Sequence, residues 1–586
     1  NPKMTLLPMM ILLAQGAVTL ANSDFAAGLE GWQVPAAEGV TVEAVQDQGN
    51  PAVRVTVADP APKGWWIVSQ SFPASPGEEW LGEAGVRPVA VRNGAGAYLT
   101  IEYLGADGKR LSVEQTEMPP ADGLATRLRV LSIAPEGAAT GKFCLVFNGF
   151  GEALFSHAAL SVSPPPPPAG DGPVTVRVTD QTACKSLIGF GAEDDGWFYN
   201  ADNRAKGVTE EDCRLHDDRI AWMEPDWVRM FFWYPDWNPS GDWETFDFET
   251  DNLRSHHRAL DLYQRLGAHV NVVGVEWGVK DPFGDPVKLA RTVGALMEHL
   301  IKDRGYTCVR SWTLTNEPNG HFIHSGYDFA RFRDIHLAVR AEFQRRGLDI
   351  SIVGSDDTGG FAFFSRCVND PDYFAAADYF VSHRYLQHSS RRMMSVFLDE
   401  RLALLREKTP EKPFVVGEFG FQDRRSGTLE NPLMEEYDYA LWTAAFVIDG
   451  LNRGVAGFSV WCLCEMYYPG NGFMNYGLWN FKDDGFRTRP VYHAWAPFSR
   501  LTRRGDVVRR CEAVPSGRVA AAYAGDTLFW VNESAVPAEV VIEGAAPKTV
   551  RIMTEDTLAG DRECGREQAL ENGRFTAPPR SFGHAR

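Results

Sequence analysis

The sequence predicts an α/β protein in which a (β/α)₈ TIM barrel lies between two β-rich segments, and three observations lead to that prediction. The 586 residues are too many for one ordinary domain. Between about residues 185 and 503, short β-branched or aromatic runs alternate with amphipathic stretches, which is typical of parallel β/α units. On both sides of this region the helical pattern is replaced by short runs in which apolar and polar residues alternate, as in β-strands.

The first 21 residues have the features of a signal peptide. Lys3 supplies a positive charge, the run from Leu6 to Leu20 is almost wholly apolar, and Ala21 is a small residue at the expected cleavage point. The run is short for a membrane span, and an N-terminal anchor that is never cleaved is the alternative. We therefore expect a secreted or periplasmic protein with no membrane partner after signal cleavage.

Residues 22–163 are expected to form a β-sandwich. Alternating runs recur at 52–57, 97–103 and 142–147, and clusters of Gly, Pro, Asp and Asn separate them. The opening residues 22–32 (Asn-Ser-Asp-Phe-Ala-Ala-Gly-Leu-Glu-Gly-Trp) resemble the first strand of galactose-binding-like jelly rolls, many of which are carbohydrate-binding modules. That resemblance implies a sugar-binding jelly roll, and a purely structural accessory domain is the alternative.

A run of five prolines within residues 164–173 favours a stiff polyproline II linker and marks a domain boundary. The barrel is then assigned to residues 174–504. Residues 505–586 return to alternating runs such as 527–531, which predicts a small C-terminal β-sandwich. The polar tail from Glu563 is expected to be loosely ordered.

Eight runs in the central region have the length and composition of strands, and a helical stretch follows each. They begin near Leu187, Trp227, His269, Ser311, Ile350, Tyr379, Phe414 and Gly457. Eight alternating units over about 320 residues suit a closed parallel barrel. A doubly wound open sheet is the alternative, but it would usually bring a Gly-x-Gly-x-x-Gly turn after the first strand, and residues 188–191 do not supply one.

Charge and cysteine content narrow the possible partners and cofactors. A net charge of −19 argues against nucleic acid as a partner. Because there are nine cysteines, an odd number, at least one of them is unpaired within the chain. Cys462 and Cys464 are close in sequence, but no second pair of cysteines accompanies them, as a zinc site would require. Cys511 and Cys564 are a candidate disulfide. With no clusters of His at strand ends, we expect no metal and no other cofactor.

Two predicted strands each end in a glutamate. The fourth runs into Asn316-Glu317-Pro318, and the seventh contains Gly417-Glu418. Catalytic groups of a (β/α)₈ barrel lie at the carboxyl ends of strands, and strands four and seven lie on opposite sides of its mouth. Retaining glycoside hydrolysis needs two carboxyl groups about 5–5.5 Å apart, which this arrangement can provide.

With these motifs, the whole predicted barrel resembles the glycoside hydrolases of clan A, in the style of families 39 and 5. The resemblance is strongest at residues 316–318, at Glu418 and at the opening 188–193 (Ile-Gly-Phe-Gly-Ala-Glu), and it does not extend to the N-terminal segment. It implies a retaining enzyme that cleaves an equatorial, β-type bond in an oligo- or polysaccharide. Glu317 would be the acid/base and Glu418 the nucleophile.

The resemblance also implies roles for five further residues. Asn316 would hold the sugar 2-hydroxyl, and Arg229 would keep the nucleophile ionised. His383 and Tyr385 match a His-x-Tyr pair whose tyrosine hydroxyl bonds the nucleophile, and Trp461 would form an aromatic floor for the sugar. Three of the five have a structural alternative: a buried ion pair for Arg229, a core histidine for His383, and plain barrel core for Trp461.

Three other residues at strand ends are candidate substrate contacts. Glu193 follows the first strand, and Glu276 with Trp277 ends the third. The residues leave two further functions open, namely a sugar-binding barrel without catalytic activity and a transglycosylase that uses the same glutamates.

Overall fold

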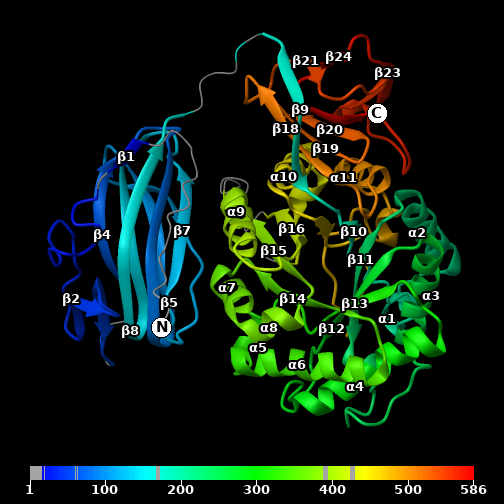
Figure 1. The fold of residues 1–586 in the computed structure, drawn as a ribbon, viewed down its shortest axis with the longest axis horizontal. Coiled ribbons are helices and arrows are strands. Elements are labelled where there is room, and N and C mark those ends of the chain that lie inside the picture. Colours follow the sequence, from blue (N-terminus) through cyan, green and yellow to red (C-terminus); the bar gives the residue numbers. More distant parts are fainter. Residues whose placement is uncertain are drawn as a thin grey trace. The chain divides into compact units, whose positions relative to one another are not determined.

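Figure 1 shows the fold in the computed structural model, which describes residues 16–18, 20–59, 61, 64–165, 170, 172–386, 393–422, 429–470 and 472–586. The chain divides into two compact units within the Pro-rich segment, between residues 167 and 168. Most of the predicted signal peptide, residues 1–15 and 19, lies outside the described residues. Among the helices that are described, none combines the length and the apolar character needed to cross a membrane.

The first unit is built from antiparallel β-strands, as the alternating runs predicted. Over its described residues these are β1 Gly16–Val18, β2 Val40–Asp47, β3 Asn50–Val57, β4 Trp65–Pro73, β5 Glu79–Gly105, β6 Arg110–Gln115, β7 Thr126–Ile133 and β8 Ala138–Ser163. The long strands β5 and β8 pair with each other, and β8 also pairs with β1, β3 and β4. One face of these strands carries a core that includes Val55, Leu99 and Phe143.

The second unit contains a parallel barrel. Its eight described strands are β10 Gly189–Ala192, β11 Trp227–Trp233, β12 His269–Val275, β13 Val309–Thr313, β14 Ser351–Thr358, β15 Tyr379–Leu386, β16 Phe414–Phe421 and β17 Gly457–Val460. Neighbours pair in parallel from β11 to β17, and β17 pairs with β10. The ring closes where the Asp226 amide donates to Phe190 (2.9 Å) and the Asp194 amide donates to Arg229 (2.9 Å). The prediction of an eight-stranded parallel barrel is confirmed.

Helices connect the barrel strands and surround them (Figure 1). They are α1 Ala201–Ala205, α2 Glu210–Met223, α3 Asp251–Leu266, α4 Pro286–Glu298, α5 His321–His324, α6 Phe329–Arg346, α7 Phe361–Asn369, α8 Pro371–Ala376, α9 Met393–Arg406, α10 Tyr437–Arg453 and α11 Pro490–Leu501. Because helices cover their outer faces, strands such as β16 are buried at every residue. Helix α2 begins at a capping box in which Thr209 and Asp212 bond each other's backbone amides.

The C-terminal strands form a curled sheet that packs against α10 and α11. Its order is β23 Arg566–Ala569, β22 Thr549–Met553, β25 Ser581–Ala585, β20 Thr527–Asn532, β19 Val519–Ala524, β18 Val508–Val514, β9 Val174–Cys184, β21 Ala538–Glu543 and β24 Arg574–Ala577.

Two expectations about this sheet are wrong. Strand β9, which the sequence assigned to the barrel segment, pairs with β18 and β21. Its burial alternates along the strand, as in a sheet with one solvated face, whereas a barrel strand such as β16 is buried at every residue. The tail after Glu563 is not loose, because β25 is wholly buried between β20 and β22.

All nine cysteines lie within the described residues, and none forms a disulfide. The predicted Cys511–Cys564 pair is therefore wrong. Strand β18 places Cys511 in the core of the C-terminal sheet, whereas the Cys564 thiol lies 3.3 Å from Nδ1 of His493 on α11.

Candidate active site

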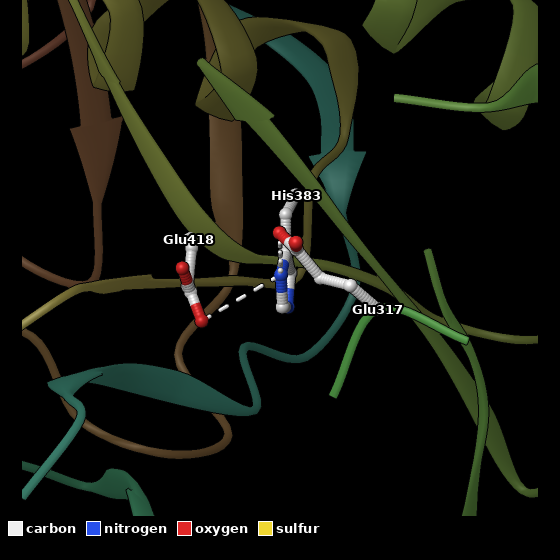
Figure 2. Close-up of side chains that lie close together, drawn as sticks. All are labelled: Glu317, His383 and Glu418. Atoms are coloured by element: carbon white, nitrogen blue, oxygen red, sulfur yellow. Dashed lines mark hydrogen bonds and ion pairs between the residues drawn. The ribbon is translucent and has the colours of Figure 1, made fainter. Parts of the chain in front are cut away.

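The structure brings Glu317 and Glu418 together at the mouth of the barrel. Glu317 follows β13, the fourth barrel strand, and Glu418 lies in β16, the seventh. One carboxylate oxygen from each lies within 4.8 Å of the other. Figure 2 shows His383 between them. The Glu317 side chain is 30% exposed and that of Glu418 only 5%, so one is open to the cleft and the other is almost enclosed.

Arg229 lies beneath this pair, fully buried, and holds three carboxylates. Its Nη1 donates to Glu418 Oε1 and to Glu193 Oε2, each at 2.7 Å. Its Nη2 donates to Asp356 Oδ2 at 2.9 Å and to Asn316 Oδ1 at 3.1 Å. Burial alone would lower the pKa of Arg229, but the surrounding carboxylates raise it well above its usual value. The guanidinium is a permanent counter-charge for Glu418.

His383 is the second buried cation of the site. In the β15–β16 pairing it lies beside Glu418. Its Nδ1 lies 3.1 Å from Glu317 Oε1 and 3.6 Å from Glu418 Oε1, and its Nε2 lies 3.2 Å from Asp356 Oδ1. Burial favours the neutral ring, but Glu418 and Asp356 outweigh it and raise the pKa of His383 to about 10. The ring is therefore an imidazolium at neutral pH.

Tyr385 completes the contacts of Glu418. Its hydroxyl donates to Glu418 Oε2 at 2.9 Å, while Oε1 accepts from Arg229. With a charged donor on one oxygen and a neutral donor on the other, the carboxylate is fixed in direction.

Asp356 belongs to the site, although sequence reasoning missed it. This buried residue near the end of β14 contacts both Arg229 and His383, and these two cations outweigh burial and hold its pKa below the usual value. Ser355 and Asp356 both have left-handed backbone (φ 58° and 52°), and the β14–β15 register shifts between Ser355 and Asp357. Two consecutive acidic residues at the end of an apolar strand were a visible signal, but the irregular backbone decides which one faces inward.

A cleft of about 870 Å³ opens above the two glutamates and is rich in aromatic side chains. Those that line it include Phe231, Trp277, Trp461, Tyr468, Phe473 and Tyr476. Trp461 follows β17, stacks on Tyr476 with 4.8 Å between ring centroids, and donates its indole N–H to Asp195. Trp277 is 38% exposed. Flat apolar rings beside polar groups such as Asn316 suit a sugar, which has apolar faces and polar edges.

Two candidate substrate contacts do not reach the cleft wall. Glu193 is fully buried against Arg229, because β10 ends one residue earlier and directs the side chain into the barrel. Glu276 is 3% exposed and contacts Thr315 and His321. Burial raises the pKa of Glu276 to about 7 despite its bond from Thr315. Neither carboxylate lines the cleft, where a direct contact with substrate was expected, whereas Trp277 does line it.

Replacing Asp194 with asparagine is expected to change how stability depends on pH. Burial raises the pKa of Asp194 to about 7, and Tyr263 donates to it at 2.6 Å. Between pH 4 and 7 the folded chain keeps a proton on Asp194 that the unfolded chain releases, so the contribution of Asp194 to stability falls as pH rises, by up to about 1.4 kcal/mol per pH unit. Asparagine does not titrate, so the Tm difference, variant minus wild type, should rise from pH 4.5 to 7 and then level off. Thermal melts that give a constant difference would contradict the assignment.

No family model matches the sequence, and no curated protein sequence matches it significantly. Solved structures do match. Glycoside hydrolases share this fold. The catalytic domain of GH30 xylanase C from Talaromyces cellulolyticus has a TM-score of 0.51 at 12% identity, over 70% of this chain and 99% of that one. A conserved exported protein from Bacteroides fragilis gives 0.52 at 13% identity, over 70% and 99%.

An endo-β1,6-glucanase gives a TM-score of 0.50 at 12% identity, over 83% of this chain and 98% of that one. The similarity to glycoside hydrolases, which the sequence motifs implied, is confirmed at the level of the fold.

Proposed function

We propose that this chain is a retaining glycoside hydrolase that cleaves an equatorial, β-type glycosidic bond, with Glu317 as acid/base and Glu418 as nucleophile. One observation carries the proposal: oxygens of the two carboxylates lie within 4.8 Å of each other. Retaining enzymes hold their carboxyl groups about 5–5.5 Å apart, whereas inverting enzymes need about 6.5–9.5 Å to admit a water molecule.

The surroundings of each glutamate support its role. Glu418 is almost enclosed and accepts hydrogen bonds from Arg229 and Tyr385, which orient the carboxylate that attacks the anomeric carbon. Glu317 faces the cleft and can reach the leaving-group oxygen. In the first step Glu418 forms the bond to the sugar while Glu317 gives its proton to the leaving oxygen. In the second step Glu317 takes a proton from water as that water displaces Glu418.

His383 can stabilise the negative charge on either glutamate during this cycle. In the resting enzyme Glu418 is the anion, and its Oε1 lies 3.6 Å from His383 Nδ1. Once Glu418 is esterified and Glu317 has given up its proton, the negative charge resides on Glu317, whose Oε1 lies 3.1 Å from the same nitrogen. One imidazolium between the glutamates therefore stabilises whichever of them is charged.

We further propose an oligo- or polysaccharide substrate, with Trp277 and Trp461 stacking on sugar rings and Asn316 holding the 2-hydroxyl. The aromatic cleft supports this, and a xylanase and a β1,6-glucanase share the fold. The N-terminal antiparallel strands (22–163) are proposed to form a sugar-binding jelly roll, and the C-terminal sheet a small sandwich. A signal peptide in residues 1–21 and secretion or periplasmic export belong to the same proposal.

The proposal is tested on a panel of aryl β-glycosides and polysaccharides. We expect the wild-type protein to hydrolyse at least one of them and a double variant, Glu317→Gln with Glu418→Gln, to hydrolyse none. The glutamines keep the size of the side chains and remove the acid and the nucleophile. Hydrolysis that persists in the double variant would place the active site elsewhere.

Tyr385→Phe is expected to lower kcat about 10- to 100-fold, because a hydrogen bond to a charged group is worth about 1.5–3 kcal/mol and Glu418 would lose it. Tyr476→Phe is the matched control, since Tyr476 also lines the cleft but its hydroxyl accepts from Gln422 and does not contact Glu418. Steady-state kinetics on one aryl glycoside would show a large loss only in the first variant. Equal losses of kcat in the two variants would show that the Tyr385 hydroxyl has no specific role at Glu418.

The group Glu317, His383 and Glu418 also has the composition of a metal site. Its charges argue against that use, because His383 is an imidazolium and Arg229 already neutralises Glu418. We expect that dialysis against EDTA leaves hydrolysis unchanged and that added zinc or manganese does not raise it. Loss of activity on chelation, restored by one of these metals, would favour a metal-assisted hydrolase instead.

A further inference from the structure

Glu276 is a buried carboxyl group beside the segment that carries Glu317. It directly follows β12, is 3% exposed and does not line the cleft. Burying a carboxyl group is unfavourable unless specific partners compensate for the lost water. Its partners therefore indicate what it does.

The two oxygens of Glu276 contact residues on both sides of Glu317. Oε2 accepts a 2.6 Å hydrogen bond from the hydroxyl of Thr315, itself buried, two residues before Glu317. Oε1 lies 3.2 Å from Nε2 of His321, four residues after Glu317 and the first residue of α5. One side chain thus joins the two ends of the short segment that presents the acid/base.

That segment needs restraint because its backbone is strained. Glu317 has a φ of 49°, in the left-handed region that favours glycine. A non-glycine residue keeps such a conformation only when neighbouring contacts hold it there. Within the segment, the amides of Gly320 and His321 bond the Glu317 carbonyl at 3.0 and 3.3 Å.

We propose that Glu276 is a positioning residue that, through Thr315 and His321, sets where the Glu317 carboxyl lies relative to the leaving-group oxygen. The inference rests on the proposed function, because it assigns Glu276 a role in the acid step. Glu276 itself touches no substrate. A displacement of about 1 Å in a catalytic group can cost on the order of 100-fold in rate.

The test compares kcat/KM for two glycosides of one sugar, a phenyl glycoside and a dinitrophenyl glycoside. The phenolate leaving group is poor and needs proton donation, whereas dinitrophenolate leaves without it. Glu276→Ala should lose about 100-fold on the phenyl substrate and keep its activity on the dinitrophenyl substrate. Glu276→Gln keeps the shape and an acceptor for Thr315, so it should recover most of the loss. A role in folding alone would lower both rates together.

Thr315→Val is the second variant, because it removes one of the two contacts and keeps the size of the side chain. Thr315→Val should show the same dependence on the leaving group, with a smaller loss of kcat/KM. If Glu276→Ala does not fold, the result for Thr315→Val tests the proposal in its place. Equal losses on both substrates, or no loss on either, would overturn the proposal. Glu317→Gln, measured on the same two substrates, tests the acid/base assignment separately. If this variant lost the same activity on both substrates, the proposed function would be refuted, independently of the results for the Glu276 variants.

Discussion

Replacing Glu418 with alanine should lower kcat on aryl glycosides by a factor on the order of 10⁵, because the loss of a covalent nucleophile removes the first chemical step. The alanine also leaves a gap beside Arg229 and Tyr385, which now face it without their acceptor. A small anion such as azide can occupy that gap and attack the anomeric carbon. Azide should therefore restore turnover.

The configuration of the azide product distinguishes the two glutamates. In Glu418→Ala, azide attacks from the face that the nucleophile occupied, and the glycosyl azide has inverted configuration. In Glu317→Ala, Glu418 still forms the glycosyl-enzyme, azide attacks in the second step, and the product has retained configuration. Proton NMR of both products, made from the same dinitrophenyl glycoside, is the measurement. The opposite pattern would exchange the two roles, and no rescue in either variant would contradict the site.

Arg229→Met should destabilise the second unit by about 3–5 kcal/mol, which for a unit of this size corresponds to a fall in Tm of about 3–6 °C. The variant removes the cation that Glu193 contacts and leaves the buried Asp356 and Glu418 with His383 alone. Methionine has a similar length, so loss of packing is a small part of the effect. Arg229→Lys keeps the charge, but a single ammonium cannot reach four partners and should restore only part of the stability.

The matched control for Arg229 is Arg574→Met, which breaks an ion pair with Glu539 whose partners are about half exposed. Exposed pairs contribute little, so its Tm should stay near that of the wild type. Differential scanning calorimetry at pH 7 compares the three variants. A Tm for Arg229→Met that matches the control would mean that the buried carboxylates take up protons and do not need the guanidinium.

The sequence predicted site residues well wherever a charged or polar side chain interrupts or directly follows an apolar run. A strand of the parallel barrel is buried on both faces, so Glu418 within such a strand was conspicuous, as was Glu317 just after one. The same contrast revealed Arg229 and His383. The sequence pattern placed the starts of the barrel strands to within two residues; the largest differences are Leu187 against Gly189 and Ser311 against Val309.

What the sequence could not provide depends on backbone geometry and on contacts between distant segments. The irregular β14 determines that Asp356 and not Asp357 meets Arg229; Asp357 instead pairs with Arg401. Glu276 looked like a substrate contact because it ends a strand, and only its bonds to Thr315 and His321 show otherwise. Strand β9 is separated from its partner β18 by the whole barrel, so local pattern could not place it in the C-terminal sheet.

The most direct test of the central claim is the anomeric configuration of the first product, followed by proton NMR immediately after enzyme is added to a β-glycoside that it hydrolyses. One oxygen of Glu317 and one of Glu418 lie within 4.8 Å of each other, which is closer than the roughly 6.5–9.5 Å at which an inverting enzyme admits a water molecule. We predict that the β-anomer of the free sugar appears first and the α-anomer only later, as mutarotation proceeds. An α-anomer that appears first would show single displacement by water and would contradict the assignment of Glu418 as a nucleophile.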